Sequence, residues 1–332
     1  MKRLFLVALS LATPVAVIAD TTVFSDDFSG GSTIQSATPG AGTATSADYE
    51  NFNQGIAPVN YSIAPGALHF ETRPTSSALG EVEARFGGGP VTLATVGDYV
   101  TLSLTFVDTA NVLTTGANAN SSINIGLFNS GGVNLNQGLQ LDGAQVTGGS
   151  QTYLGYVSRL FFNGNASGYN RNTQNIGSST TSQNQDLLFN NASSSAAFNS
   201  PGGANFTGTS GSPTGFNSGL VQGSTYTYNL TISLTAANAV LVNEQLYTGA
   251  GTGGTQLINF SGTSTGGAFL GSTFDALAFG FRYTSSTSLA GSLDISQITV
   301  SDLIQPIPEP TSVAILGFAA LGVGLGYRRL RR

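Results

Sequence analysis

Short stretches of strict alternation between apolar and polar residues limit the fold of this chain more than any other feature. Residues 100–107 read VTLSLTFV and residues 225–235 read TYTYNLTISLT, so aromatic or aliphatic side chains occupy every second position. Related runs lie at 122–128, 156–162, 277–283 and 293–300. Successive side chains of a β-strand point to opposite faces of the sheet, so the pattern predicts half-buried antiparallel strands.

Composition favours the same class of fold. Charged residues make up 8% of the chain, too few for a bundle of amphipathic helices, and 40% of residues are hydrophobic, which is enough for a core. Gly accounts for 44 of 332 residues and often separates the strands, as in FGGGP (86–90) and FNSGG (128–132). The sequence therefore predicts an all-β body over residues 20–304, folded as an antiparallel β-sandwich.

One part of the body has a different composition. Residues 163–223 are rich in Asn, Ser, Gly and Thr, with short apolar pieces such as DLLF. We expect long loops inserted in the sandwich there, with one or two irregular strands. Loops at a sandwich rim often bind ligands, but solvated filler is the other interpretation.

The distribution of charge excludes one class of partner. Between Asp20 and Ile307 there are five arginines and sixteen carboxylates, a formal charge of about −11. Nucleic acid requires a basic surface, so we expect no nucleic-acid partner. Cysteine is absent, which excludes disulfides, thiolate nucleophiles and Cys-based zinc sites.

The N-terminus has the three parts of a secretory signal peptide. Lys2 and Arg3 form the positive start, and an apolar stretch follows to Val17. Small residues precede a cleavage point between Ala19 and Asp20. The sequence predicts that residues 1–19 direct the chain to the Sec translocon and are removed by a signal peptidase; an uncleaved anchor is the alternative.

The C-terminus reads as a membrane span followed by a basic tail. Residues 311–327 carry no charge and would form a helix about 26 Å long, enough for a thin bilayer. Arginines next to a span keep that side in the cytoplasm, so the body is expected outside the inner membrane. These arginines are Arg328, Arg329, Arg331 and Arg332.

The short motif Pro308-Glu309-Pro310 precedes this helix directly. Motif, helix and basic tail together, over residues 305–332, resemble the PEP-CTERM sorting signal recognised by exosortases in Gram-negative bacteria. The resemblance implies that an exosortase cuts near the motif, so that the chain is held in the inner membrane only transiently. The body would then reach the cell surface or the extracellular matrix. A permanent anchor is the alternative.

The body resembles the concanavalin A-like, or laminin-G-like, jelly roll. The matching features are an early DDFSG at 26–30 and a last strand LDISQITVSDL at 293–303. The resemblance spans most of residues 20–304, and it implies a fold without fixing a function.

Residues 68–86 hold the one dense cluster of charge. The candidate residues are His69, Glu71, Arg73, Glu81, Glu83 and Arg85. A hairpin about Ser77 would place Glu71 opposite Glu83 and Arg73 opposite Glu81. Two carboxylates this close could act as the catalytic pair of a retaining glycosidase. The favoured interpretation is instead an exposed polar face with cross-strand ion pairs. A ligand-binding face is a further alternative.

Metal sites have little support in the sequence. His69 is the single histidine, and no Walker or Rossmann motif is present. We expect no cofactor. The one candidate ion is calcium, at Asp26 and Asp27 or at Asp98, because acidic loops suit that ion.

These observations lead to one function hypothesis and two alternatives. We expect a non-enzymatic, exported surface or matrix protein that associates with exopolysaccharide, since Ser, Thr, Asn and Tyr can all contact sugars. A glycoside hydrolase or lyase using Glu71, Glu81 or Glu83 is the first alternative. A purely structural surface protein is the second.

Overall fold

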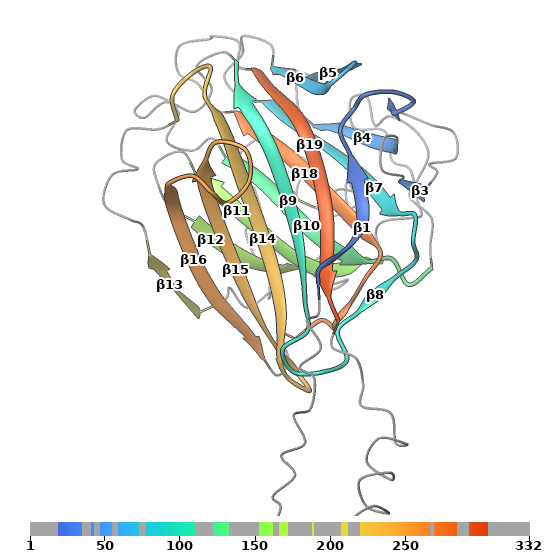
Figure 1. Ribbon diagram of the computed structural model, residues 1–332, viewed down its shortest axis with the longest axis vertical. Helices are drawn as coiled ribbons and strands as arrows, with labels where there is room; N and C mark the ends of the chain where they lie inside the picture. Colours follow the sequence, from blue (N-terminus) through green and yellow to red (C-terminus); the bar gives the residue numbers. More distant parts are fainter. Residues whose placement is uncertain are drawn as a thin grey trace, which may run out of the picture.

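The protein is a sandwich of two β-sheets in a computed structural model (Figure 1). The structure describes residues 19–34, 41–42, 47–54, 59–72, 78–109, 122–132, 153–161, 166–171, 188, 207–211, 220–265, 269–283 and 292–304. The predicted signal peptide up to residue 18 and the whole of the predicted sorting signal, residues 305–332, lie outside these ranges. No helix in the described part of the chain is long and apolar enough to cross a membrane.

The first sheet has nine strands, which Figure 1 shows in front. Its order is β13 (Thr207–Gly211), β16 (Gln256–Thr265), β15 (Ala239–Thr248), β14 (Thr225–Ala236), β9 (Tyr99–Asp108), β19 (Ser292–Leu303), β6 (Ala67–Thr72) and β5 (Val59–Ala64). Strand β1 (Thr21–Asp26) also pairs with β19. All pairings in this sheet are antiparallel.

The second sheet has eight strands and lies behind the first. Its order is β12 (Ala166–Arg171), β11 (Leu154–Phe161), β10 (Ser122–Asn129), β18 (Ala276–Tyr283), β7 (Ala78–Phe86), β4 (Asp48–Gln54) and β2 (Thr33–Ile34). Strand β3 (Ala41–Gly42) pairs with β7, in parallel, and β2 pairs with β4 in the same way. A small separate ladder joins β8 (Val91–Thr92) to β17 (Thr273–Phe274).

The alternation seen in the sequence builds the core between the sheets. On β9, Leu102, Leu104 and Phe106 are all buried, and the residues between them face outward. Phe70 of the first sheet packs against Phe279 of the second, with ring centroids 5.6 Å apart. Burying one such side chain stabilises a fold by about 1.5–3 kcal/mol. The prediction of an all-β, largely antiparallel sandwich is confirmed.

The strands follow the predicted stretches closely. The runs beginning at residues 100, 122, 156, 225, 277 and 293 became β9, β10, β11, β14, β18 and β19. Within the range expected to be loop-rich, 163–223, the structure describes the short strands β12 and β13. Each sheet therefore has one face in the core and one outer face, and the polar groups of interest lie on the two outer faces.

Candidate functional site

The structure divides the charged cluster of residues 68–86 between the two sheets. His69 and Glu71 lie on β6 in the nine-stranded sheet, whereas Glu81, Glu83 and Arg85 lie on β7 in the eight-stranded sheet. Arg73 lies outside the described residues. The predicted hairpin about Ser77 is therefore wrong, and Glu71 does not oppose Glu83.

The physical reason is a tighter turn just upstream. Pro65 and Gly66 follow β5, and Gly66 has φ of +90°, a conformation that suits glycine. The chain reverses there, so β6 pairs with β5 at one edge. Strand β19 pairs with its other edge, which leaves no edge of β6 for β7. The Pro-Gly dipeptide was the sequence signal for this pairing.

His69 and its neighbours form a partly exposed set at one end of the nine-stranded sheet. His69 Nδ1 lies 2.5 Å from an oxygen of Asp294, and its Nε2 lies 3.9 Å from Glu71 Oε2. About a third of the His69 side chain is exposed, at 34%. Ion pairs this open to solvent contribute little to stability, about 0–1 kcal/mol.

The carboxylates of β7 lie on the outer face of the eight-stranded sheet and are fully shielded from solvent. Glu81 and Glu83 are both 0% exposed, so the prediction of a solvated face is wrong for these two. Across the ladder they oppose Gly280 and Ala278 of β18, whose small side chains leave room for them. The backbone N–H of Leu188 donates to Glu81, with N–O distances of 3.1 and 3.2 Å.

Two more polar side chains share this outer face on the next strands. Asn124 of β10 is 0% exposed, and neither atom of its amide makes a hydrogen bond with any described residue. Arg159 of β11 lies opposite Asn124 and donates from Nε to the Ser122 hydroxyl at 3.2 Å. Asn124 is therefore shielded from solvent on the same face as Glu81 and Glu83.

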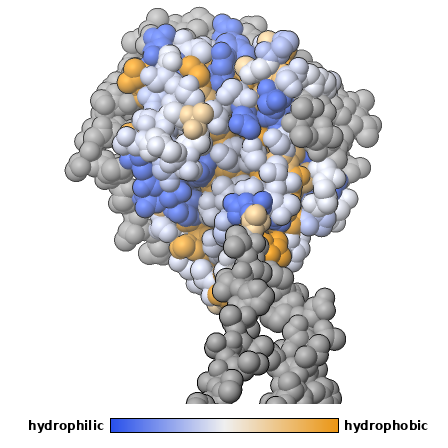
Figure 2. Space-filling model, viewed as in Figure 1, coloured by the Kyte–Doolittle hydropathy of each residue, from blue (hydrophilic) through white to orange (hydrophobic). Residues whose placement is uncertain are grey.

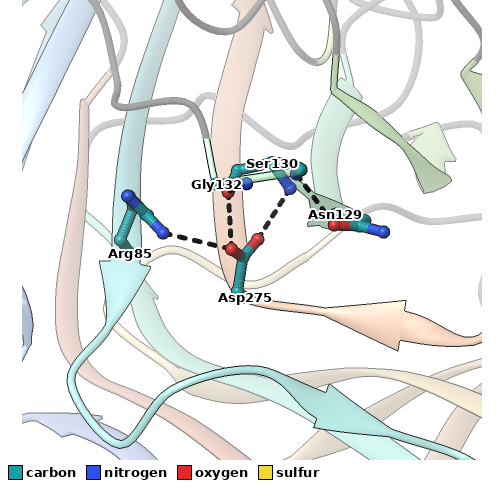
Figure 3. A network of polar contacts seen from close by, with 6 residues as sticks. Arg85, Asn129, Ser130, Gly132 and Asp275 are labelled. Atoms are coloured by element: carbon teal, nitrogen blue, oxygen red, sulfur yellow. Dashed lines mark hydrogen bonds and ion pairs between the residues drawn. The ribbon is translucent and has the colours of Figure 1, made fainter.

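A denser network of polar contacts joins Arg85, Asp275, Ser130 and Asn129 on this side of the sandwich (Figure 3). Arg85 Nη2 lies 3.1 Å from Asp275 Oδ2, with a quarter of the Arg85 side chain exposed. Asp275 also accepts from Ser130, through the backbone N–H at 2.7 Å and the hydroxyl at 2.5 Å. We call Arg85, Asp275, Ser130 and Asn129 the rim network.

The turn after β10 fixes the geometry of the rim network. Asn129 accepts from the Gly131 N–H at 2.9 Å, and the Ser130 hydroxyl accepts from the Gly132 N–H at 3.1 Å. Gly131 and Gly132 have φ of +61° and +83°, which explains the FNSGG sequence. Asp275 is held from the other side, because its own backbone bonds to Phe86 and Phe128.

Tyr153 lies beneath the rim network. Burial, and then the negative charge of Glu83, raise the pKa of the Tyr153 hydroxyl, while Arg85 opposes the rise. The hydroxyl also interacts with the Ser130 side chain. Tyr153 therefore stays neutral and lies within electrostatic reach of both the rim network and Glu83.

The three carboxylates predicted for calcium all accept hydrogen bonds in the structure, Asp27 from the Ser29 N–H at 2.9 Å. Asp26 accepts from the Phe28 N–H, the Ser32 hydroxyl and the Tyr49 hydroxyl, at 2.7–2.8 Å. Asp98 accepts from the backbone N–H groups of Ala94 and Thr95. These donors leave a cation poorly placed. The described residues contain no group of three or more His, Asp or Glu side chains arranged to hold a metal.

The outer face of the nine-stranded sheet carries a different set of groups. Three rows run across β19, β9, β14, β15 and β16, and every residue in them is uncharged. We call these rows the hydroxyl–amide face. The rows are Ser301, Thr101, Thr231, Asn243 and Ser261; Thr299, Ser103, Asn229, Gln245 and Asn259; and Gln297, Thr105, Thr227, Tyr247 and Gln256.

Sequence reasoning identified Glu83 and Arg85 as candidates but missed the partners that organise them. Asp275 lies 190 residues from Arg85 along the chain, and Ser130 lies 145 from Asp275. The available signals were the Asn-Ser-Gly-Gly turn and the single Asp just before the LAFGFRY run. Neither signal indicates which charged residue it will meet.

Comparison with solved structures gave distant matches. The carbohydrate recognition domain of Emp47p matches with a TM-score of 0.39 and 11% identity, covering 85% of this chain and 96% of that one. Lectin II from Ulex europaeus gives 0.33 and 12%, over 76% and 93%. The CBM2 module of an evolved Dit protein of Lactobacillus casei BL23 phage J-1 gives 0.41 and 10%, over 87% and 98%.

No protein-family model matches the chain. No curated protein matches its sequence either.

Proposed function

We propose that this is an exported, non-enzymatic carbohydrate-binding protein whose body associates with exopolysaccharide through the rim network. The observation that carries the proposal is the Arg85 side chain, which is a quarter exposed and is held by Asp275, itself bonded to Ser130, at one end of the eight-stranded sheet. It places charged, hydroxyl and amide groups side by side in a fixed geometry. Sugar hydroxyls both donate and accept, so a mixed set of this kind matches them.

The net charge of the body restricts the classes of glycan that it can bind. The body carries a formal charge of about −11 between Asp20 and Ile307, which disfavours strongly acidic polymers. A neutral or weakly charged glycan is the expected ligand.

Replacing Arg85 tests this proposal. Arg85→Met keeps the stem of the side chain and removes its donors, so affinity for the extracellular polysaccharide of the producing cells should fall by roughly tenfold. The matched control is Glu71→Gln, which changes an exposed charge on the other sheet. Unchanged binding by Arg85→Met, with folding intact by circular dichroism, would refute the rim network as the site.

A glycosidase is the less favoured function. Glu81 and Glu83 lie two residues apart on one strand with no exposed surface, and Glu81 already accepts from Leu188. Release of sugar by the wild-type chain, abolished by Glu83→Gln, would reverse this preference.

Export and sorting form the second part of the proposal. The support is the motif Pro308-Glu309-Pro310, the apolar stretch 311–327 and the four arginines after it. An exosortase would cut near the motif after the Sec translocon and signal peptidase have acted, so the chain would pass transiently through the inner membrane of a Gram-negative cell. Glu309→Ala should leave a longer, membrane-bound form on immunoblots; equal processing of both chains would refute this step.

A further inference from the structure

The first and last strands of the body meet at one end of the sandwich. Strand β1 begins at Thr21, which pairs with Asp302 near the end of β19. Just before β1, the carboxylate of Asp20 accepts from the hydroxyl of Tyr99, the first residue of β9, at 2.7 Å. Figure 1 shows these three strand ends together at the lower end of the body. We call this end the tip, and its residues are 19–22, 93–98, 234–238 and 302–304.

The loop before β9 holds one apolar side chain out into solvent at the tip. Asp98 is 0% exposed, and its carboxylate accepts from two backbone N–H groups of the loop at 2.7 and 2.9 Å. Gly97 has φ of +101°, and its N–H donates to the Leu234 carbonyl at 2.9 Å. Between these contacts, Val96 is 59% exposed. The loop therefore fixes Val96 in its outward position.

Exposed apolar side chains are concentrated at the tip. Among the residues that the structure describes, the exposed large hydrophobic side chains are those of Val96, Ile304 and Val221. Val96 and Ile304 both belong to the tip, and Figure 2 shows hydrophobic residues at this lower end. Val221 lies at the opposite end, because the nearby Gly223 donates to the carbonyl of Asp108, the last residue of β9.

Most of the charge at the tip is shielded from solvent. The tip contains no Lys or Arg, and two of its carboxylates are buried, with Asp98 0% and Asp302 9% exposed. Asp20 is its exposed charged residue. A nearly uncharged surface with outward apolar side chains can approach lipid headgroups without the cost of desolvating many charges. The remaining negative charge favours zwitterionic over anionic lipid.

We infer that the tip lies against the outer surface of the inner membrane while the sorting signal is in place, with Val96 at the lipid interface. This inference rests on the proposed export and sorting of the chain. Residues 305–310 connect Ile304 to the proposed membrane span, and a segment of that length reaches at most about 20 Å.

The length of the strands separates the tip from the other end of the body. Strand β9 has 10 residues, so the end that carries Val221 lies about 30 Å from the tip. The partly exposed contact of His69 with Asp294 is also at that far end, since Asp294 pairs with Val107. The tip therefore faces the lipid, and the far end points away from it.

The test uses single cysteines, because the natural chain has none. Val96→Cys and Val221→Cys are a matched pair, since each replaces an exposed valine and the two lie at opposite ends. Each full chain is labelled with a polarity-sensitive fluorophore and reconstituted in phosphatidylcholine vesicles, with and without a lipid that carries a nitroxide quencher on its headgroup. Flotation of the vesicles reports whether the chain is bound to the membrane.

Both chains should float with the vesicles, and the nitroxide lipid should quench the Val96 label and leave the Val221 label bright. Equal quenching of both labels, or of neither, in chains that float would overturn the inference while the membrane span stands. Failure to float would refute the membrane span and this inference with it. A Val96 label that is blue-shifted but not quenched, in a chain that sediments as a dimer, would show that a second copy covers the tip instead of lipid.

Discussion

The two outer faces of this sandwich arise from the same sequence pattern and end in opposite environments. On the nine-stranded sheet, the outward residues Thr101 and Ser103 are uncharged and partly exposed. On the eight-stranded sheet, the outward residues Glu81 and Glu83 are charged and 0% exposed. Alternation therefore determines which residues share a face, but it does not determine whether the face meets water.

This difference changes what each polar group does. A shielded carboxylate must find donors within the protein, as Glu81 does at Leu188. A partly exposed hydroxyl can exchange its protein contacts for a ligand at small cost. The eight-stranded face is accordingly organised by ion pairs and close packing, and the nine-stranded face by repeated weak hydrogen bonds.

The largest expected difference in stability is between one polar contact on each face, Arg85–Asp275 and His69–Asp294. Asp275→Ala removes the acceptor of Arg85 and of two Ser130 donors, and should lower the free energy of unfolding by about 3 kcal/mol. Asp294→Ala removes the exposed partner of His69 and should cost less than about 1 kcal/mol. Urea unfolding at neutral pH measures both. Equal losses would mean that the faces do not differ in shielding.

Substitutions that disturb packing should also cost more stability on the eight-stranded face than on the nine-stranded face, by a smaller amount than the loss of Asp275. A Cβ at Gly155 would lie 2.2 Å from the Leu127 carbonyl oxygen and 2.4 Å from a ring carbon of Phe128. Gly155→Ala should therefore destabilise the fold by about 1–3 kcal/mol. Its counterpart Ser261→Ala, on the hydroxyl–amide face, should stay within about 0.5 kcal/mol. A tolerated Gly155→Ala in thermal melts would contradict the close packing.

Glu244 is a buried carboxyl group in the core between the two sheets. It is 0% exposed and accepts from the Tyr228 hydroxyl at 3.3 Å, and Tyr228 in turn contacts Ser158 of the other sheet. Burial raises the pKa of the Glu244 carboxyl well above its ordinary 4.5, although the hydrogen bonds from Ser158 and Tyr228 oppose this. The folded protein therefore holds a proton that the unfolded chain releases.

Because the pKa of Glu244 is raised in the folded state, the free energy of unfolding should depend on pH. The contribution of Glu244 is complete below the pKa of the unfolded chain and is lost as pH rises through the raised pKa of the folded state. Glu244→Gln has no proton to lose, so its stability relative to wild type should increase with pH between about pH 4 and pH 8. Urea unfolding across that range provides the measurement. A constant difference would show that Glu244 is ionised in the core.

The sequence predicted much of the nine-stranded face and little of the rim network. The alternation in residues 100–107 and 225–235 predicted β9 and β14, because side-chain parity is a local property. Residues 239–248, AVLVNEQLYT, place Glu244 in line with Val242 and Leu246, so its core position was also readable from the sequence. Shielding of Glu81 was not readable, since it depends on Leu188, 107 residues away.

The same limit explains the misplaced hairpin. Two polar strands in succession, residues 68–73 and 81–86, look like natural partners. In a sandwich, consecutive strands can belong to different sheets, and only pairings over long separations, such as β6 with β19, decide between the options.

Co-sedimentation of the full chain with the extracellular polysaccharide of the cells that make it tests the carbohydrate-binding role most directly. Free reducing sugar in the supernatant is measured in the same tube. We expect the chain to pellet with the polysaccharide and to release no sugar. A chain that stays in the supernatant would contradict the binding role, and one that releases reducing sugar would show that the protein is an enzyme.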